Sequence, residues 1–99
     1  MASIDFARVI EKDEITDEEF NAVISYVKSL SQKLKNGNKL VDEPTRWEIC
    51  DIEIGEIVRE PWFATPVTLI SCDGKEYKTT IDWVLWRIFI MGYLHEEGN

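Results

Sequence analysis

The segment IDWVLWRIFIMGYL (residues 81–94) decides most of what the sequence predicts about the fold. Eleven of its 14 residues are apolar, and its only charged residues are Asp82 and Arg87. A helix that crosses a bilayer needs about 20 apolar residues, so this segment is too short to span a membrane. We therefore expect it to be buried, either inside the fold or against a partner.

A helix is the favoured conformation for this segment. Thr79 or Thr80 can cap its start, and Asp82 lies in the first turn, where a negative charge suits the helix dipole. The alternative is a buried strand, because tryptophan, valine, isoleucine and phenylalanine all favour strands. Fourteen residues are long for a strand and ordinary for a helix, so length favours the helix.

Plotted at 100° per residue, this helix has two unlike faces. One face is mostly aliphatic, as is usual for a core: Ile81, Val84, Leu85, Ile88, Phe89 and Met91, with Gly92 among them. The other face is largely aromatic and is flanked by one acid and one base: Trp83, Trp86, Ile90, Tyr93 and Leu94, with Asp82 and Arg87. A helix on the surface of a globular protein would be polar on this second side.

The aromatic face has two interpretations. Apolar side chains lie in cores by default, so the helix is first expected between the sheet and the N-terminal helices, covered on both sides. Alternatively the face is an interface, because Trp, Tyr and Arg are the residues enriched at binding hot spots. A homodimer is the simplest form of such an interface, since two copies can bury the same patch about a two-fold axis.

Helices are predicted before the sheet. Residues 3–12 form a short helix, and a longer one begins at Thr16 and ends near Asn36 and Gly37. Thr16 and Glu19 form a capping box, which identifies the start of the long helix. Its buried stripe recurs at three- and four-residue steps: Phe20, Val23, Ile24, Val27, Leu30 and Leu34.

An antiparallel sheet of three strands is predicted in the middle of the chain. The strands cover residues 47–54, 67–72 and 75–79, and the connection 36–45 is polar. A change of parity near Cys50 predicts a bulge, and Asp73-Gly74 predicts a two-residue hairpin turn. The fold class is therefore α+β, with N-terminal helices, a three-stranded antiparallel sheet and an apolar C-terminal helix in one globular domain, residues 1–99.

Charge restricts the partners that the sequence favours. The 99 residues include 11 basic and 19 acidic side chains, for a net charge of −8. Phosphate binding requires a basic surface, so a direct nucleic-acid partner is not expected. An anionic membrane is not expected for the same reason. Such a charge would steer the chain toward a protein with a basic surface.

The sequence predicts a cytoplasmic protein without cofactor, metal or catalytic residues. The first residues lack the apolar core of a signal peptide, so Cys50 and Cys72 are expected to be reduced, buried thiols. Two cysteines and one histidine do not complete a structural zinc site. His95 is expected to be a solvated tail residue, and no second histidine supports a cysteine nucleophile.

Two further features are candidates for partner contact. Asp51 and Glu53 point the same way on a strand, roughly 6.6 Å apart by strand rise, and Glu56 follows them. Such acidic rows are usually solvated, but this one can also imitate the phosphates of a nucleic acid and occupy a basic groove. Trp62-Phe63 lies in a loop between two prolines. We expect it to fold back on the core or, if exposed, to extend the aromatic face.

Two functional hypotheses follow. The first is a small acidic protein-interaction module, an inhibitor or immunity-type protein such as a phage anti-defence protein, that occupies a basic surface of its partner. Its predicted partner-binding residues are Trp83, Trp86, Arg87, Tyr93, Trp62, Asp51, Glu53 and Glu56. The second is a small-molecule-binding or enzymatic domain whose pocket lies between sheet and last helix, lined by Trp47, Trp62, Trp86 and Cys50. A cavity of several hundred Å³ with converging polar groups would favour the second.

Overall fold

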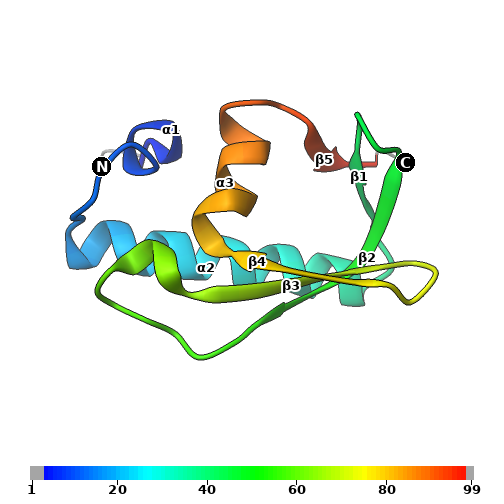
Figure 1. The fold of residues 1–99 in the computed structure, drawn as a ribbon, viewed down its shortest axis with the longest axis horizontal. Helices are drawn as coiled ribbons and strands as arrows, with labels where there is room; N and C mark the ends of the chain where they lie inside the picture. Colours follow the sequence, from blue (N-terminus) through cyan, green and yellow to red (C-terminus); the bar gives the residue numbers. More distant parts are fainter. Residues whose placement is uncertain (1–3, 98–99) are drawn as a thin grey trace.

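A computed structural model describes residues 4–97 and confirms the α+β class. Within these residues, three α-helices accompany an antiparallel sheet of five strands in the order β4-β3-β2-β1-β5 (Figure 1). In chain order the elements are α1 (Phe6–Val9), α2 (Asp17–Lys35), β1 (Leu40–Asp42), β2 (Trp47–Ile54), the 3-10 turn η1 (Trp62–Ala64), β3 (Pro66–Ser71), β4 (Glu76–Thr80), α3 (Ile81–Phe89) and β5 (Leu94–Glu96).

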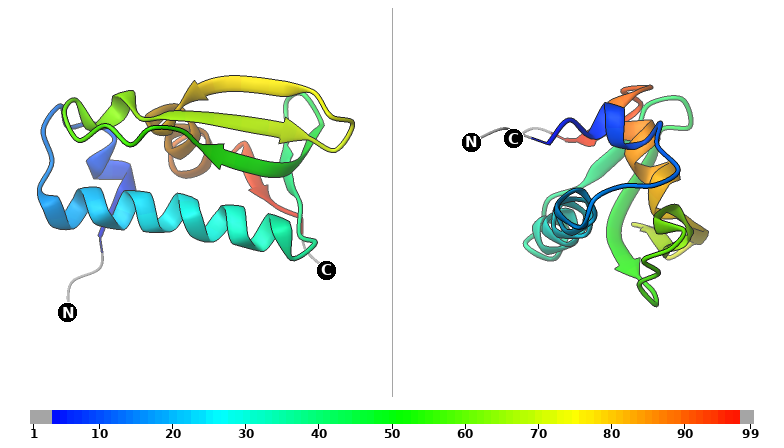
Figure 2. Two further views of the ribbon diagram at one scale, coloured as in Figure 1. Left: turned by 90° about the horizontal axis from the view of Figure 1, so that it is seen from below. Right: turned by 90° about the vertical axis from the view of Figure 1, so that its left-hand side faces the viewer.

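The long helix α2 confirms its prediction from the capping box. The Thr16 hydroxyl accepts a hydrogen bond from the Glu19 amide at 3.1 Å, and the Glu19 carboxylate accepts one from the Thr16 amide at 2.9 Å. Glycine ends the helix as expected, because Gly37 has a φ of 101°, which favours residues without a Cβ. α2 runs alongside the sheet (Figure 2), and the side chains of its predicted stripe are buried in the core.

The predicted hairpin is confirmed, with a different turn. β3 and β4 pair antiparallel, and the register shift between Ile49 and Asp51 in β2 is the bulge expected near Cys50. A two-residue turn at Asp73-Gly74 needs positive φ at both positions, but only Gly74 has it, at 93°, so the predicted turn type is wrong. The Ser71 amide donates to the Lys75 carbonyl at 2.8 Å, which makes a longer turn with glycine at its left-handed position.

The predicted number of strands is wrong, because β1 and β5 extend the sheet at one edge. β1 lies in the segment predicted as a polar connection, and β5 lies where the last helix was expected to end. Each has only three residues, too few to show a period of two in the sequence. Asp42 of β1 pairs with Trp47 of β2 on one side and with Leu94 of β5 on the other.

The last helix is confirmed as a helix but is shorter than predicted. α3 ends at Phe89 rather than Leu94, and the amides of Ile90 and Met91 both donate to the Trp86 carbonyl at 3.0 Å. Gly92 follows with a φ of 68° and reverses the chain. A glycine inside the apolar run was the sequence signal for this end.

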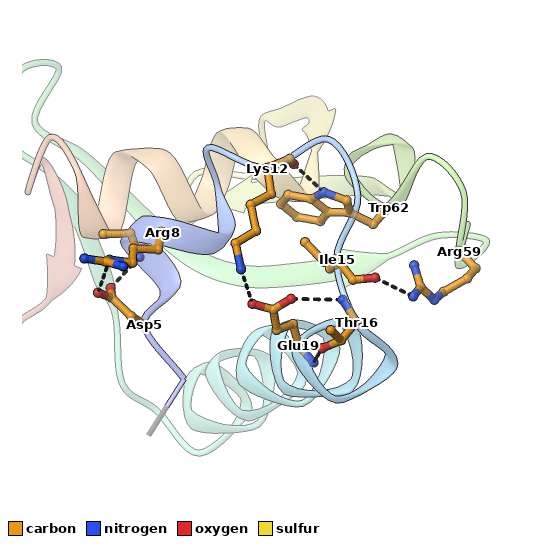
Figure 3. Close-up of polar contacts among 9 residues, drawn as sticks. Asp5, Arg8, Lys12, Ile15, Thr16, Glu19, Arg59 and Trp62 are labelled. Atoms are coloured by element: carbon orange, nitrogen blue, oxygen red, sulfur yellow. Dashed lines mark hydrogen bonds and ion pairs between the residues drawn. The ribbon is translucent and has the colours of Figure 1, made fainter. Parts of the chain in front are cut away.

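A single hydrophobic core lies on one face of the sheet. It joins the stripe of α2 to inward residues of the strands and of α3, including Ile49, Ile52, Leu69 and Val84. The loop before β3 folds back as expected, because the Trp62 indole is buried and its N–H donates to the Lys12 carbonyl at 3.0 Å (Figure 3).

The two cysteines form a disulfide, which corrects the prediction of reduced, buried thiols. Cys72 is exposed and Cys50 half-buried, because the bulge and the end of β3 bring them together outside the core, with a Cα–Cα distance of 4.9 Å. Disulfides are typical of oxidising compartments, so a cytoplasmic location stays a prediction. No helix in the described part of the chain has the length and apolarity that a membrane span requires.

Candidate binding surfaces around the last helix

The buried side of α3 fixes the helix on the sheet. Ile81, Val84 and Leu85 are fully buried, as predicted for the aliphatic face. Phe89 and Met91 were also predicted on this face, and for them the prediction is wrong. Both are exposed because the helix ends at Phe89 and the chain leaves the core there. The remaining surface of α3 has two sides of different character.

One side of α3 carries an exposed apolar surface that we call the α3 patch. Four large side chains form it, each roughly two-fifths exposed: Trp86 (43%), Phe89 (37%), Ile90 (43%) and Met91 (37%). Phe89 extends the patch to neighbouring helices, since its ring lies 5.0 Å from that of Phe6 and 5.2 Å from that of Tyr26. Burial raises the pKa of the Tyr26 hydroxyl. The prediction that this helix is covered on both sides is therefore only partly correct.

The other side of α3 is organised by a cation between two rings. The Arg87 guanidinium carbon lies 4.8 Å from the centre of the Trp83 ring and 5.3 Å from that of Tyr93. Both aromatic side chains are half-buried, unlike Trp86. The aromatic face predicted from the sequence is therefore divided, and only part of it is open to a partner.

Arg87 forms a mostly buried ion pair that the sequence did not reveal. Its Nε and Nη2 donate to Asp42 Oδ1 at 3.0 and 2.5 Å, and the Thr45 hydroxyl donates to Asp42 Oδ2 at 2.6 Å. Asp42 is only 6% exposed. An aspartate that points into the core from a strand needs a charged or hydrogen-bonding partner. The strand β1 has only three residues, however, and could not be recognised from the sequence.

A cavity of about 310 Å³ opens beside this ion pair, between α3 and the inner face of the sheet. All five strands contribute to its wall: Asp42, Trp47, Ile49, Leu69, Tyr77 and Leu94, joined by Thr45, Trp83 and Arg87. Of the pocket lining predicted from the sequence, only Trp47 is present. Trp62 lies in the core, Trp86 in the α3 patch and Cys50 in the disulfide.

Three aromatic rings line one wall of the cavity. Trp47 and Tyr77 meet edge to face with ring centres 6.1 Å apart, and Tyr77 and Trp83 lie 5.2 Å apart. Within residues 4–97 the indole N–H groups of Trp47 and Trp83 have no protein acceptor, whereas that of Trp62 has one. The two tryptophans of the cavity therefore keep donors open to solvent or a ligand.

The acidic row lies away from the α3 patch. Asp51 and Glu53 have the parity opposite to buried Ile52, so their side chains point away from the core. Lys28 and Lys35 of α2 line the same groove as these two carboxylates. Glu56 is exposed in the loop after β2. The predicted partner-binding residues are thus not one surface, and buried Trp62 belongs to none.

Comparisons with known proteins give no likeness from which to assign these surfaces. No protein-family model matches the chain, and neither curated proteins nor solved structures gave a match. Among residues 4–97, no three His, Cys, Asp or Glu side chains gather closely enough to hold a metal ion. The α3 patch and the cavity are therefore the features of the molecule that bear on its function.

Proposed function

We propose that this chain is a small acidic protein-interaction module, an inhibitor or immunity-type protein of the kind that phage anti-defence proteins represent. Its α3 patch docks in an apolar hollow of a partner protein, and basic residues surround that hollow. The observation that carries the proposal is the exposure of Trp86 and Phe89 in the last turn of α3 together with Ile90 and Met91 directly after it.

The composition of the α3 patch supports a protein partner. Tryptophan is among the residues that supply most of the binding energy at interfaces, and a contiguous exposed apolar patch usually marks an interaction site. In the described part of the chain the other large hydrophobics of comparable exposure are Ile57 and Tyr77. Because Ile81, Val84 and Leu85 hold the helix in place, docking would order little additional structure.

Charge supports a basic rim on the partner. The net charge of −8 attracts positively charged surfaces over a distance, and Asp82 lies one helical turn before Trp86. Electrostatic attraction of this kind mainly raises the association rate and weakens with salt. The acidic row of β2, which points away from the core, contributes to this long-range field and is not part of the docking contact.

Site-specific photocrosslinking tests the proposal. A photoreactive amino acid replaces Trp86 in one variant and Ile57 in the other, since Ile57 has a matching exposure of 44% in the loop after β2. In cells that naturally produce the chain, we expect position 86 alone to crosslink to one discrete protein. The activity of that protein should fall when the wild-type chain is added and be unaffected by Trp86→Glu.

Other outcomes overturn the proposal. Equal crosslinking from positions 86 and 57 would mean that the α3 patch has no special role. Crosslinks between two copies of the chain would make the patch a homodimer interface. A partner whose association rate is insensitive to salt would exclude the basic rim.

A further inference from the structure

We propose that the cavity between α3 and the sheet binds a neutral, planar heteroaromatic molecule of nucleobase size that carries a hydrogen-bond donor beside an acceptor. The proposal concerns a site separate from the α3 patch and is independent of the protein-interaction function. It rests on the shape of the cavity walls, their charge balance and the hydrogen-bonding groups that remain open.

The walls favour a flat, apolar ring. Trp47, Tyr77 and Trp83 supply aromatic faces and edges on one side, and aliphatic side chains from β2, β3 and β5 supply the floor. Aromatic rings stack on flat ligands, and this stacking tolerates variation in ring chemistry. The volume of about 310 Å³ is at the lower end for ligand pockets, which suits one or two fused rings.

The polar end of the cavity favours a ligand without net charge. Its two charged groups, Arg87 and Asp42, already neutralise each other through bonds of 3.0 and 2.5 Å. An anionic ligand would compete with Asp42 for Arg87, and a cationic ligand would compete with Arg87 for Asp42. In either case one mostly buried charge would lose part of its pairing, which is costly at low solvent exposure.

Open hydrogen-bonding groups favour a donor beside an acceptor on the ligand. A guanidinium has five N–H donors, and within residues 4–97 two side-chain N–H groups of Arg87 are engaged, both with Asp42 Oδ1. Asp42 Oδ2 accepts from the Thr45 hydroxyl and keeps capacity for one more donor. A ligand edge with an acceptor toward Arg87 and a donor toward Asp42 satisfies both groups at once.

The site is held rigidly before any ligand enters. Asp42 lies in register with Trp47 and Leu94, so one row across three strands carries the carboxylate and two wall residues. Arg87 is held by its ion pair and by the rings of Trp83 and Tyr93. Preorganisation of this kind lowers the ordering cost of binding a small molecule.

Adenine is the probe that tests this inference, because its amino group lies beside a ring nitrogen acceptor. It is titrated into the wild-type chain while NMR follows the four indole N–H resonances. We expect saturable shifts for Trp47 and Trp83 and none for Trp62 and Trp86. The Trp62 resonance also reports an intact fold, since its N–H is bonded to the Lys12 carbonyl.

Variants and charged probes locate the binding. Tyr77→Thr keeps a strand-forming residue but removes one ring, and it should weaken adenine binding roughly 5- to 100-fold. Trp86→Ala, outside the cavity, should leave the affinity unchanged. Benzoate and benzamidinium, planar ligands of opposite charge, should both bind more weakly than adenine.

Several results would overturn the inference. These are the absence of saturable shifts at Trp47 and Trp83, tighter binding of either charged probe, or shifts confined to Trp86. If Tyr77→Thr fails to fold, Tyr77→Leu, which also lacks the ring, replaces it, and unchanged adenine affinity in that variant would exclude stacking in the cavity. Crosslinking from position 86 is measured with a protein partner and without adenine, so failure of this inference is distinguishable from failure of the proposed function.

Discussion

Trp83 and Trp86 lie on the same helix, three residues apart, yet their surroundings differ. Trp83 is half-buried against Tyr77 and the cation of Arg87 and lines a cavity. Trp86 is 43% exposed and belongs to the α3 patch with Ile90. The side of α3 that carries Trp83 is held by aromatic and polar contacts. The side that carries Trp86 is exposed.

The difference between the two sides is the mostly buried charge of Arg87, which packs against Trp83 and Tyr93 and not against Trp86. Arg87 must pair with an acceptor when it leaves water, and Asp42 of β1 supplies one. That pairing holds Trp83 and Tyr93 beside the sheet and leaves a cavity among the side chains. Trp86, without such a neighbour, stays available for another molecule.

Removing the ion pair should have the largest effect on stability. Asp42→Ala leaves Arg87 mostly buried without its partner, and we expect the free energy of unfolding to fall by about 3–5 kcal/mol. Asp17→Ala is a matched control, because Arg59 Nε and Nη2 bind Asp17 Oδ1 in the same way, at 3.1 and 3.0 Å, but the Asp17 side chain is 91% exposed. Asp17→Ala should lower the free energy of unfolding, measured by urea denaturation, by about 1 kcal/mol or less. Equal losses would mean that the cavity side of α3 is not organised by a buried charge.

Opening the disulfide should weaken the sheet that forms the floor of the cavity. Cys50 and Cys72 are 22 residues apart, and a loop of this size gives a stabilisation of about 3 kcal/mol through restriction of the unfolded chain. Cys50→Ser/Cys72→Ser should lower the free energy of unfolding by this amount. Wild-type chain under reducing conditions should behave in the same way. An unchanged free energy of unfolding in both would exclude a stabilising disulfide.

Truncating the two tryptophans compares the sides of α3 directly. Trp83→Ala removes contacts with Tyr77 and Arg87 and should cost about 1–3 kcal/mol of unfolding free energy. Trp86→Ala removes an exposed ring and should change it by about 0.5 kcal/mol or less. If Trp86→Ala is the more damaging substitution, the division of α3 into a structural side and an open side is wrong.

The smallest effect concerns the end of β5, which holds the edge of the cavity sheet. A hydrogen bond that the His95 imidazole donates to the Glu43 carboxylate raises the pKa of His95 above its ordinary value of 6.5. The folded chain therefore binds this proton more tightly than the unfolded chain. The stabilisation is fully present below the unfolded pKa and is lost as pH rises through the folded pKa.

Unfolding measurements between about pH 6 and pH 8 check this sign. Stability should decline slightly with rising pH in the wild type, and His95→Gln should remove that part of the pH dependence. An imidazole pKa at or below 6.5, measured by NMR, would contradict the contact with Glu43.

Much of the fold was predictable because its signals are local. The capping box of Thr16 and Glu19 and the parity change at Cys50 each depend on a few neighbouring residues, and the structure confirms both. β1 and β5 were missed because three residues carry no period and because their pairing joins segments about 50 residues apart. Such pairing follows from tertiary structure rather than from local sequence.

The candidate sites were less predictable than the fold. Trp86 was predicted as a partner-binding residue, and its exposure is consistent with that prediction, which stays untested. The cavity was expected from the general position of sheet and helix, but Asp42, Tyr77 and Thr45 were not among its predicted residues. The role of Asp42 and Thr45 depends on the pairing of β1 with β5 and on the ion pair with Arg87, neither of which leaves a local signal.

The native mass in solution, wild type against Trp86→Glu, tests most directly whether the α3 patch is an open surface kept for another protein. We expect both chains to be folded monomers of about 11.5 kDa, because a charge at an exposed position disturbs neither core nor cavity. A wild-type dimer that Trp86→Glu converts to a monomer would show that the patch serves self-association. An unfolded Trp86→Glu chain would show that the patch is part of the core, and either result would contradict the account.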